Sequence, residues 1–175
     1  QTASESLKQH WPGSKGVILQ KLEHINGTVV YSALASIPPR DDEILHSLRG
    51  YIQREVANLR FLRSLVDSFP NQGRVIPFLV ETLHLRESKS EERLVKAVGL
   101  LGNARAMELN RKSLNAGDAS TRASALEALE TLGDRRITLD VLPILDRGGM
   151  FKGADESSLG IAEAVDLLLA EEDEW

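Results

Sequence analysis

Residues 118–134 read DASTRASALEALETLGD, and this stretch carries the clearest helical pattern in the chain. We predict a helix over residues 120–132, ended by Gly133-Asp134. A second helix is expected to follow over residues 135–147. The structural unit predicted here is therefore helix, turn, helix.

The same unit recurs earlier in the chain. Helices are expected over residues 91–101 and 105–116, joined around Gly102-Asn103. Before them, a helix over residues 75–83 is expected to stop ahead of the polar run from Glu87 to Glu92. Together with the helix expected to end at Phe69, these helices form three successive pairs, which indicates an internal repeat.

The repeat has a period of 31 residues. Shifting the sequence by 31 aligns Val66, Ala97 and Ala128, then Gln72, Asn103 and Asp134, then Arg74, Arg105 and Arg136, then Leu83, Leu114 and Leu145. Units of this size bury their apolar faces against neighbouring units, which builds a solenoid. We therefore predict an all-α fold, a right-handed α-α superhelix in the form of a short solenoid, with a C-terminal capping helix over residues 157–170.

The N-terminal part has weaker patterns. Between Gly16 and Ile37, apolar residues spaced by four and then three predict two short helices. The Asn26-Gly27 pair is also a strong hairpin signal, so two strands are the alternative. Asp41 or Asp42 is then expected to cap a helix that is long and reaches Phe69, or that bends near Gly50.

Composition agrees with a helical protein of one domain. The 175 residues are 42% hydrophobic and 27% charged, as in globular proteins, and the 27 leucines and 16 alanines favour helices over strands. We predict a single repeat domain over residues 1–175, with irregular helices over 1–50, the clearest repeats over 51–147, and a glycine-rich loop and acidic cap over 148–175. Because the chain starts at Gln1, we expect a fragment of a longer polypeptide.

The sequence resembles HEAT and HEAT-like repeats. The residues that carry the resemblance are Leu114, Asp118 to Arg122, Ala125-Leu126, Ala128-Leu129 and Leu132-Gly133-Asp134. The unit from Leu94 to Val98, followed by Leu101-Gly102-Asn103, resembles the pattern less fully, and armadillo-type repeats are an alternative. Residues 59–147 are also similar to HEAT-like regions of bacterial transporter-related proteins, where such repeats connect a membrane domain to a nucleotide-sensing one.

Charge and hydropathy narrow the classes of partner. The net charge is −5, and the last 26 residues alone hold −7, so a nucleic-acid binder is disfavoured unless a local basic groove exists. No stretch approaches the roughly 20 apolar residues that span a bilayer. The chain contains no cysteine, which agrees with a reducing compartment. We expect a cytoplasmic protein, or the cytosolic part of a membrane-associated one.

Familiar enzyme motifs are absent. The nucleophile elbow, the phosphate-binding P-loop and the dinucleotide fingerprint do not occur, and the four histidines have no paired ligand spacing. The glycine-rich segment from Gly148 to Gly153 is interpreted as a connection before the last helix. We therefore predict no catalytic residue, no metal ligand and no cofactor.

A column of arginines is the feature that suggests binding. Arg74, Arg105 and Arg136 each stand at the expected start of a second repeat helix, where the helix dipole disfavours a cation by about 0.3–1 kcal/mol. One interpretation is a structural ladder of ion pairs with carboxylates such as Glu108 or Asp140. The other is a row of guanidinium groups that bind an acidic peptide or a phosphate, which makes these three arginines candidate partner-binding residues.

The function predicted from these observations is a noncatalytic helical-repeat scaffold. Its concave surface would bind a segment of another protein or another domain of the same polypeptide. The alternative is a HEAT-like enzyme of the phycobilin-lyase type, because such lyases share the repeat pattern. A deep pocket with polar groups gathered on one wall would favour that alternative.

Overall fold

The chain is described from a computed structural model, which covers residues 6, 9–11, 13–24, 26–38, 44–69, 76–101, 120, 127 and 135–145. Its elements are α2 (Lys15–Lys21), α3 (Gly27–Ser36), α4 (Leu45–Ser68), α5 (Ile76–Leu101) and α8 (Arg135–Leu145). No strand occurs among these residues, so the prediction of an all-α chain is confirmed for them. None of these helices combines the length and apolarity needed to cross a membrane.

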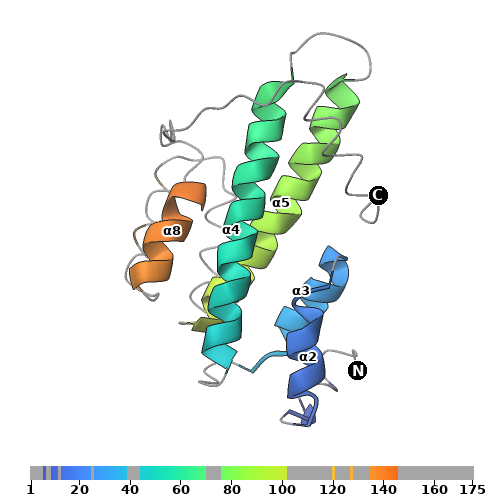
Figure 1. Cartoon of the computed structure of the whole chain (residues 1–175), viewed down its shortest axis with the longest axis vertical. Helices are drawn as coiled ribbons and strands as arrows, with labels where there is room; N and C mark the ends of the chain where they lie inside the picture. Colours follow the sequence, from blue (N-terminus) through green and yellow to red (C-terminus); the bar gives the residue numbers. More distant parts are fainter. Residues whose placement is uncertain are drawn as a thin grey trace.

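The two long helices form the centre of the molecule. Figure 1 shows α4 and α5 side by side and antiparallel, with α2 and α3 next to one end of the pair and α8 on the other flank of α4. Contacts join α4 to α5 and α8, and join α3 to α2 and α5. Every described helix therefore packs on the α4–α5 pair directly or through one neighbour.

The two short helices predicted between Gly16 and Ile37 are present as α2 and α3. Asn26 is the N-cap of α3, and its Oδ1 accepts hydrogen bonds from the backbone N–H of Thr28 at 2.9 Å and of Val29 at 3.4 Å. An asparagine in this position satisfies helix donors that would otherwise lack partners. The hairpin alternative for Asn26-Gly27 is therefore wrong.

Helix α4 is the long helix predicted to reach Phe69, and it runs through Gly50 without interruption. Its N-cap is Ile44, which makes no side-chain capping hydrogen bond. The predicted capping residues Asp41 and Asp42 lie outside the described residues, so their capping role stays a prediction.

Helix α5 corrects the predicted repeat boundary. We expected one helix to stop before the polar run from Glu87 to Glu92 and another to begin near residue 91, but α5 continues through the run over 26 residues. The run contains neither glycine nor proline, and its inward side chains Glu87 and Ser90 are buried against partners on α4. Polar residues that find hydrogen-bond partners at a helix interface do not end a helix.

The seam between α4 and α5 follows alternating steps of three and four residues, the spacing that keeps one helix face towards a neighbour. On α4 the positions are Leu48, Ile52, Glu55, Leu59, Leu62, Val66 and Phe69, and on α5 they are Val80, Leu83, Glu87, Ser90, Leu94, Ala97 and Leu101. The polar members Glu55, Glu87 and Ser90 lie in the middle of the seam.

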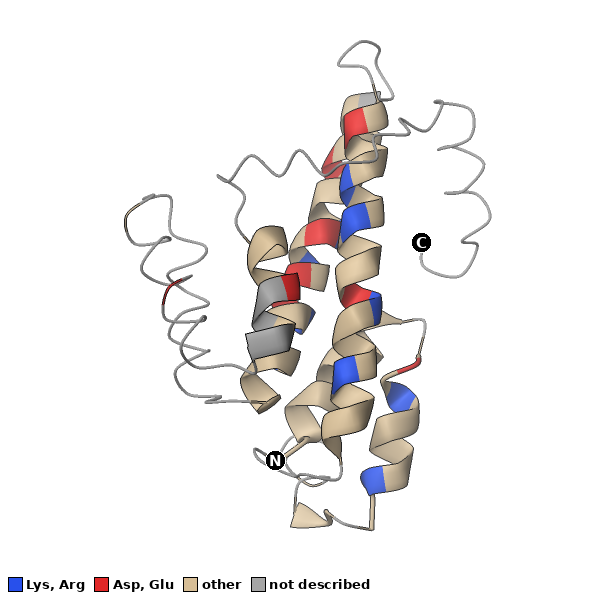
Figure 2. Ribbon diagram, turned by 60° about the vertical axis from the view of Figure 1, so that its left-hand side comes forward, with Lys and Arg blue, Asp and Glu red and all other residues tan. Residues whose placement is uncertain are grey.

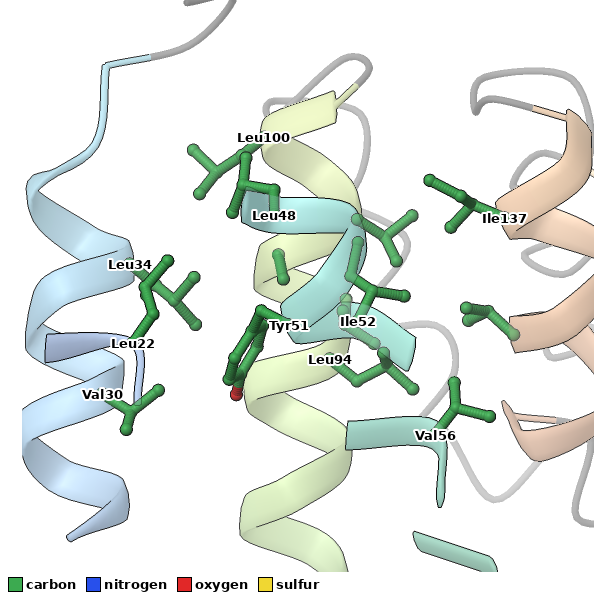
Figure 3. Close-up of a cluster of buried hydrophobic side chains, with 14 of the residues drawn as sticks. Leu22, Val30, Leu34, Leu48, Tyr51, Ile52, Val56, Leu94, Leu100 and Ile137 are labelled. Atoms are coloured by element: carbon green, nitrogen blue, oxygen red, sulfur yellow. The ribbon is translucent and has the colours of Figure 1, made fainter. Parts of the chain in front are cut away.

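On α5 this polar layer lies between two apolar clusters, whereas on α4 Glu55 lies among residues of the larger one. The larger cluster joins side chains of α2, α3, α4, α5 and α8, and Figure 3 shows Leu34 and Tyr51 on one side of α4 and Ile137 on the other. The smaller cluster contains Leu62, Leu65, Phe69 and Leu83 at the far end of the α4–α5 pair. The larger cluster thus joins all the described helices, while the smaller one joins only the far ends of α4 and α5.

Helix α8 confirms the helix predicted over residues 135–147, with Pro143 inside it. Of the helix predicted over residues 120–132, Ser120 and Glu127 are described, and both are helical. The helices expected over residues 105–116 and 157–170 lie outside the described residues. The superhelix and its capping helix stay predictions.

Candidate functional site

A buried ion pair joins α4 to α5. Glu55 is 7% exposed, and its Oε1 accepts hydrogen bonds from Arg93 Nη2 at 2.8 Å and from Arg93 Nε at 3.2 Å. The same oxygen accepts a hydrogen bond from the hydroxyl of Ser90, which in turn accepts one from Asn58 Nδ2 at 3.4 Å. The carboxylate therefore holds the guanidinium and the hydroxyl in fixed positions.

The hydroxyl of Tyr51 lies next to this ion pair. Tyr51 is buried, and its hydroxyl oxygen makes no hydrogen bond with a described residue. Burial, followed by the negative charge of Glu55, raises the pKa of Tyr51 far above its ordinary value. Burial is the largest influence and alone would lower the pKa of Arg93, but the contributions of Glu55 and Tyr51 together outweigh it and the pKa is raised. Both side chains therefore keep their protons at neutral pH.

A second polar cluster lies farther along the same interface. Arg63 on α4 donates from Nε to Glu87 Oε1 at 2.7 Å and from Nη2 to Glu91 Oε1 at 2.9 Å. His84 Nδ1 lies 3.3 Å from Glu87 Oε2. These pairs fix the register of α4 against α5 and account for the acidic residues inside α5.

The start of α3 packs directly on Arg93. A Cβ atom at Gly27 would collide with Arg93 Nη1 and would lie 3.1 Å from its Cζ. Only glycine leaves room for the guanidinium at this close approach. Farther along α3, the Lys96 ammonium stands 5.0 Å from the centre of the Tyr31 ring, a cation–π contact that also joins α3 to α5.

These contacts border a pocket of about 490 Å³. From α3 and its cap it is lined by Asn26, Gly27, Thr28 and Tyr31. From the long helices it is lined by Asn58, Leu62, Arg86, Lys89, Glu92 and Arg93. The volume lies within the range of roughly 300–1,000 Å³ that is typical of ligand pockets. The pocket is mainly polar, and α5 supplies all of its charged side chains.

Ser90 and His84 belong to the residue types that act as nucleophile and general base in enzymes. Ser90 is fully buried, so its hydroxyl is not accessible to a substrate despite its hydrogen bond to Glu55. His84 is exposed, and its Nδ1 contacts the carboxylate of Glu87. No group of three histidine, aspartate or glutamate side chains among the described residues could hold a metal ion.

The predicted arginine column is only partly described. Arg74 and Arg105 lie outside the described residues. Arg136 is the second residue of α8, so its backbone occupies the predicted helix start, but its side chain lies outside what the structure describes. Its assignment as a partner-binding residue stays a prediction, as do those of Arg74 and Arg105.

The cations of the pocket were not identified from the sequence. Arg86, Lys89 and Arg93 recur at intervals of three and four residues, which places them on one face of a helix. The sequence contains this spacing, but the prediction that a helix ends before the run from Glu87 to Glu92 separated these residues from one another. Figure 2 shows basic and acidic residues interspersed along the described helices.

Comparison with protein-family models, with curated proteins and with solved structures finds no match for this chain. The resemblance to HEAT repeats therefore rests on the quoted residues alone.

Proposed function

We propose that the chain is a noncatalytic helical scaffold that binds a protein segment in the pocket between α3, α4 and α5. The observation that carries this proposal is a pocket of about 490 Å³ whose wall includes Arg93, a side chain held in place by the buried Glu55. A preorganised wall lowers the entropy lost on binding.

The proposed function is the one predicted from the sequence, a noncatalytic helical-repeat scaffold. Helices α2 and α3 contact each other, as do α4 and α5, and such pairs of sequence neighbours occur both in HEAT-like solenoids and in other helical bundles. The partner is proposed to be a segment of another protein or another domain of the same polypeptide, in the cytoplasm. All charged side chains of this pocket come from α5, which is the arrangement expected for the lyase alternative, and that alternative stays a prediction.

Peptide selection tests the proposal. The full chain is immobilised and used to select from a displayed library of short random peptides. Thr28→Trp fills the pocket from an exposed position, and Gln20→Trp adds the same side chain at an exposed position of α2 that does not line the pocket. Selected peptides should bind Thr28→Trp about tenfold more weakly than the parent chain and bind Gln20→Trp normally.

Two results would contradict the proposal. One is that no peptide is enriched over an unrelated helical protein. The other is that the selected peptides bind the parent chain and Thr28→Trp equally well, which would place the binding surface elsewhere. Circular dichroism of both variants checks that each remains folded.

A further inference from the structure

Three cations of α5 converge on the pocket. Arg86, Lys89 and Arg93 stand at positions i, i+3 and i+7, so they share one helical face, and all three line the cavity. Glu92 is the one carboxylate among the lining residues. Three cations and one carboxylate therefore line the cavity, an excess of positive side chains, and the buried Glu55 pairs with Arg93 from behind the wall.

The geometry of Arg93 holds one of these positive charges at a defined place on the pocket wall. Its Nε and Nη2 face Glu55, and its Nη1 lies on the side of Gly27, which also lines the pocket. A guanidinium that is already oriented loses little side-chain freedom when it contacts a ligand. The Glu55 carboxylate therefore acts as a support that holds the cation at the pocket wall.

Neutral hydrogen-bonding groups surround these cations. Asn58 and Thr28 line the same cavity, and Lys89 is exposed near them. Arginine and lysine donors pair most strongly with carboxylate and phosphate oxygens, because both partners of such a hydrogen bond are charged. The whole chain has a net charge of −5, so attraction of an anion must be local to the pocket rather than a long-range effect.

We infer that this pocket binds an anionic group, a carboxylate or a phosphate, carried by the bound protein segment. The inference rests on the proposed function and specifies which chemical feature of the partner is recognised. It assigns anion binding to Arg86, Lys89 and Arg93 of α5, a set distinct from the arginine column at positions 74, 105 and 136. Lys89 would contact the anion from the exposed side and Arg93 from the wall.

Small probes test the inference without a known partner. The full chain, labelled with ¹⁵N, is titrated with inorganic phosphate, with the amide of N-acetylglutamic acid, and with the amide of N-acetylglutamine as an uncharged control of similar shape. Saturable chemical-shift changes are expected at the amides of Gly27, Thr28 and Lys89 with the two anions only. Added salt should weaken both titrations.

Two charge reversals localise the effect. Lys89→Glu places a negative charge in the pocket and should weaken the binding of both anions by about tenfold. Arg60→Glu makes the same change of net charge at an exposed position of α4 outside the pocket, and it should change affinity by less than about twofold. Tighter binding of phosphate would assign a phosphorylated residue as the ligand, and tighter binding of the glutamate derivative would assign an acidic side chain.

The inference is overturned if the glutamine derivative shifts the same amides with the same affinity, or if anions shift amides over the whole surface without saturation. It is also overturned if Lys89→Glu binds the anions as the parent chain does. Peptides selected through the pocket that contain no acidic residue would leave the proposed function standing while this inference fails. If no peptide is selected but the anions still bind saturably, the proposed function fails while anion binding in the pocket stands.

Discussion

At the scale of single residues, Glu55 connects the core to the candidate site. Its buried carboxylate holds Arg93, and Arg93 in turn borders the pocket. A buried ion pair adds little net stability compared with apolar side chains, but the loss of one partner leaves the other charge buried and uncompensated. Changes to one member of this pair should therefore be far more harmful than changes to exposed charges.

Glu55→Gln should lower the free energy of unfolding by about 2–4 kcal/mol, because Arg93 would keep its charge in a largely buried place without a counter-ion. Urea unfolding followed by circular dichroism measures the change. Glu23→Gln, which alters an exposed carboxylate, should change the same free energy by less than about 0.5 kcal/mol. Equal effects of the two substitutions would show that the buried pair does not support the fold.

Tyr51 should make the fold sensitive to alkaline pH. Its pKa is raised by burial and then by the charge of Glu55, so the folded chain keeps the phenol protonated at a pH where the unfolded chain loses that proton. The stabilising contribution is complete below the unfolded pKa of about 10 and decreases above it by about 1.4 kcal/mol per pH unit. Tyr51→Phe should remove this decrease.

The measurement is the free energy of unfolding of the parent chain and Tyr51→Phe between about pH 9 and pH 11. Tyr31→Phe is the control, and it should keep the alkaline loss. At neutral pH, Tyr51→Phe should be neutral or slightly stabilising, because the hydroxyl has no hydrogen-bond partner among the described residues. An unchanged alkaline loss in Tyr51→Phe would mean that Tyr51 is not the group responsible.

At the scale of secondary structure, the polar layer within α5 explains both its length and its pairing. Glu87 and Ser90 face α4 and hydrogen bond to Arg63 and Glu55, respectively. If α5 shifted by one turn, these groups would meet apolar side chains and lose their partners. The polar layer therefore specifies how α4 and α5 align, while the apolar residues on either side supply the burial.

Ser88 offers a direct test that α5 is continuous. It is exposed, so its replacement does not disturb the seam. Ser88→Pro should lower the free energy of unfolding by about 3 kcal/mol, because proline inside a helix removes a hydrogen bond and collides with the preceding turn. Ser88→Ala should be neutral or mildly stabilising. If Ser88→Pro costs less than about 0.5 kcal/mol, the helix is interrupted there, as the sequence pattern had suggested.

The close approach of α3 to α5 depends on Gly27. Alanine usually stabilises a helix relative to glycine by about 0.5–1 kcal/mol, and Gly16→Ala in α2 should follow this rule because no atom lies within 4 Å of the added Cβ. Gly27→Ala should instead be destabilising, since its Cβ would displace the Arg93 guanidinium that Glu55 holds. Thermal unfolding of the two variants compares them, and equal stabilisation of both would show that Arg93 moves aside without cost.

At the scale of the whole molecule, one core joins elements that are distant in the chain. Ile137, Val141, Ile144 and Leu145 of α8 belong to the same buried cluster as residues of α2 to α5. Helix α8 is thus part of the main core, although about 34 residues separate it from the end of α5. Loss of its contacts should therefore destabilise the entire fold.

Ile144→Ala should lower the free energy of unfolding by about 2–4 kcal/mol, the usual cost of removing a large buried side chain. The transition should remain single, with circular dichroism and tryptophan fluorescence changing together. Asp140→Ala, at an exposed position of the same helix, should have little effect. A separate early transition in Ile144→Ala would show that α8 unfolds independently of α4 and α5.

The sequence predicted some elements well because their patterns are local. Helices α2, α3, α4 and α8 follow apolar spacing and breakers that lie within each segment. The prediction divided α5 into two helices because Glu87 and Ser90 are polar at core positions. A single sequence does not show the partners on α4 that make such burial possible. The pocket was missed for the same reason, as its walls come from three helices.

The sequence by itself determined the helical class, because leucine and alanine at helical spacing bury an apolar stripe in no other regular structure. Only the tertiary structure decided that Arg93 lies between Glu55 and Gly27, whose positions in the chain are 38 and 66 residues away from it. Helical periodicity arises from hydrogen bonds between neighbours in sequence, whereas a binding pocket arises from side chains that packing brings together from distant segments.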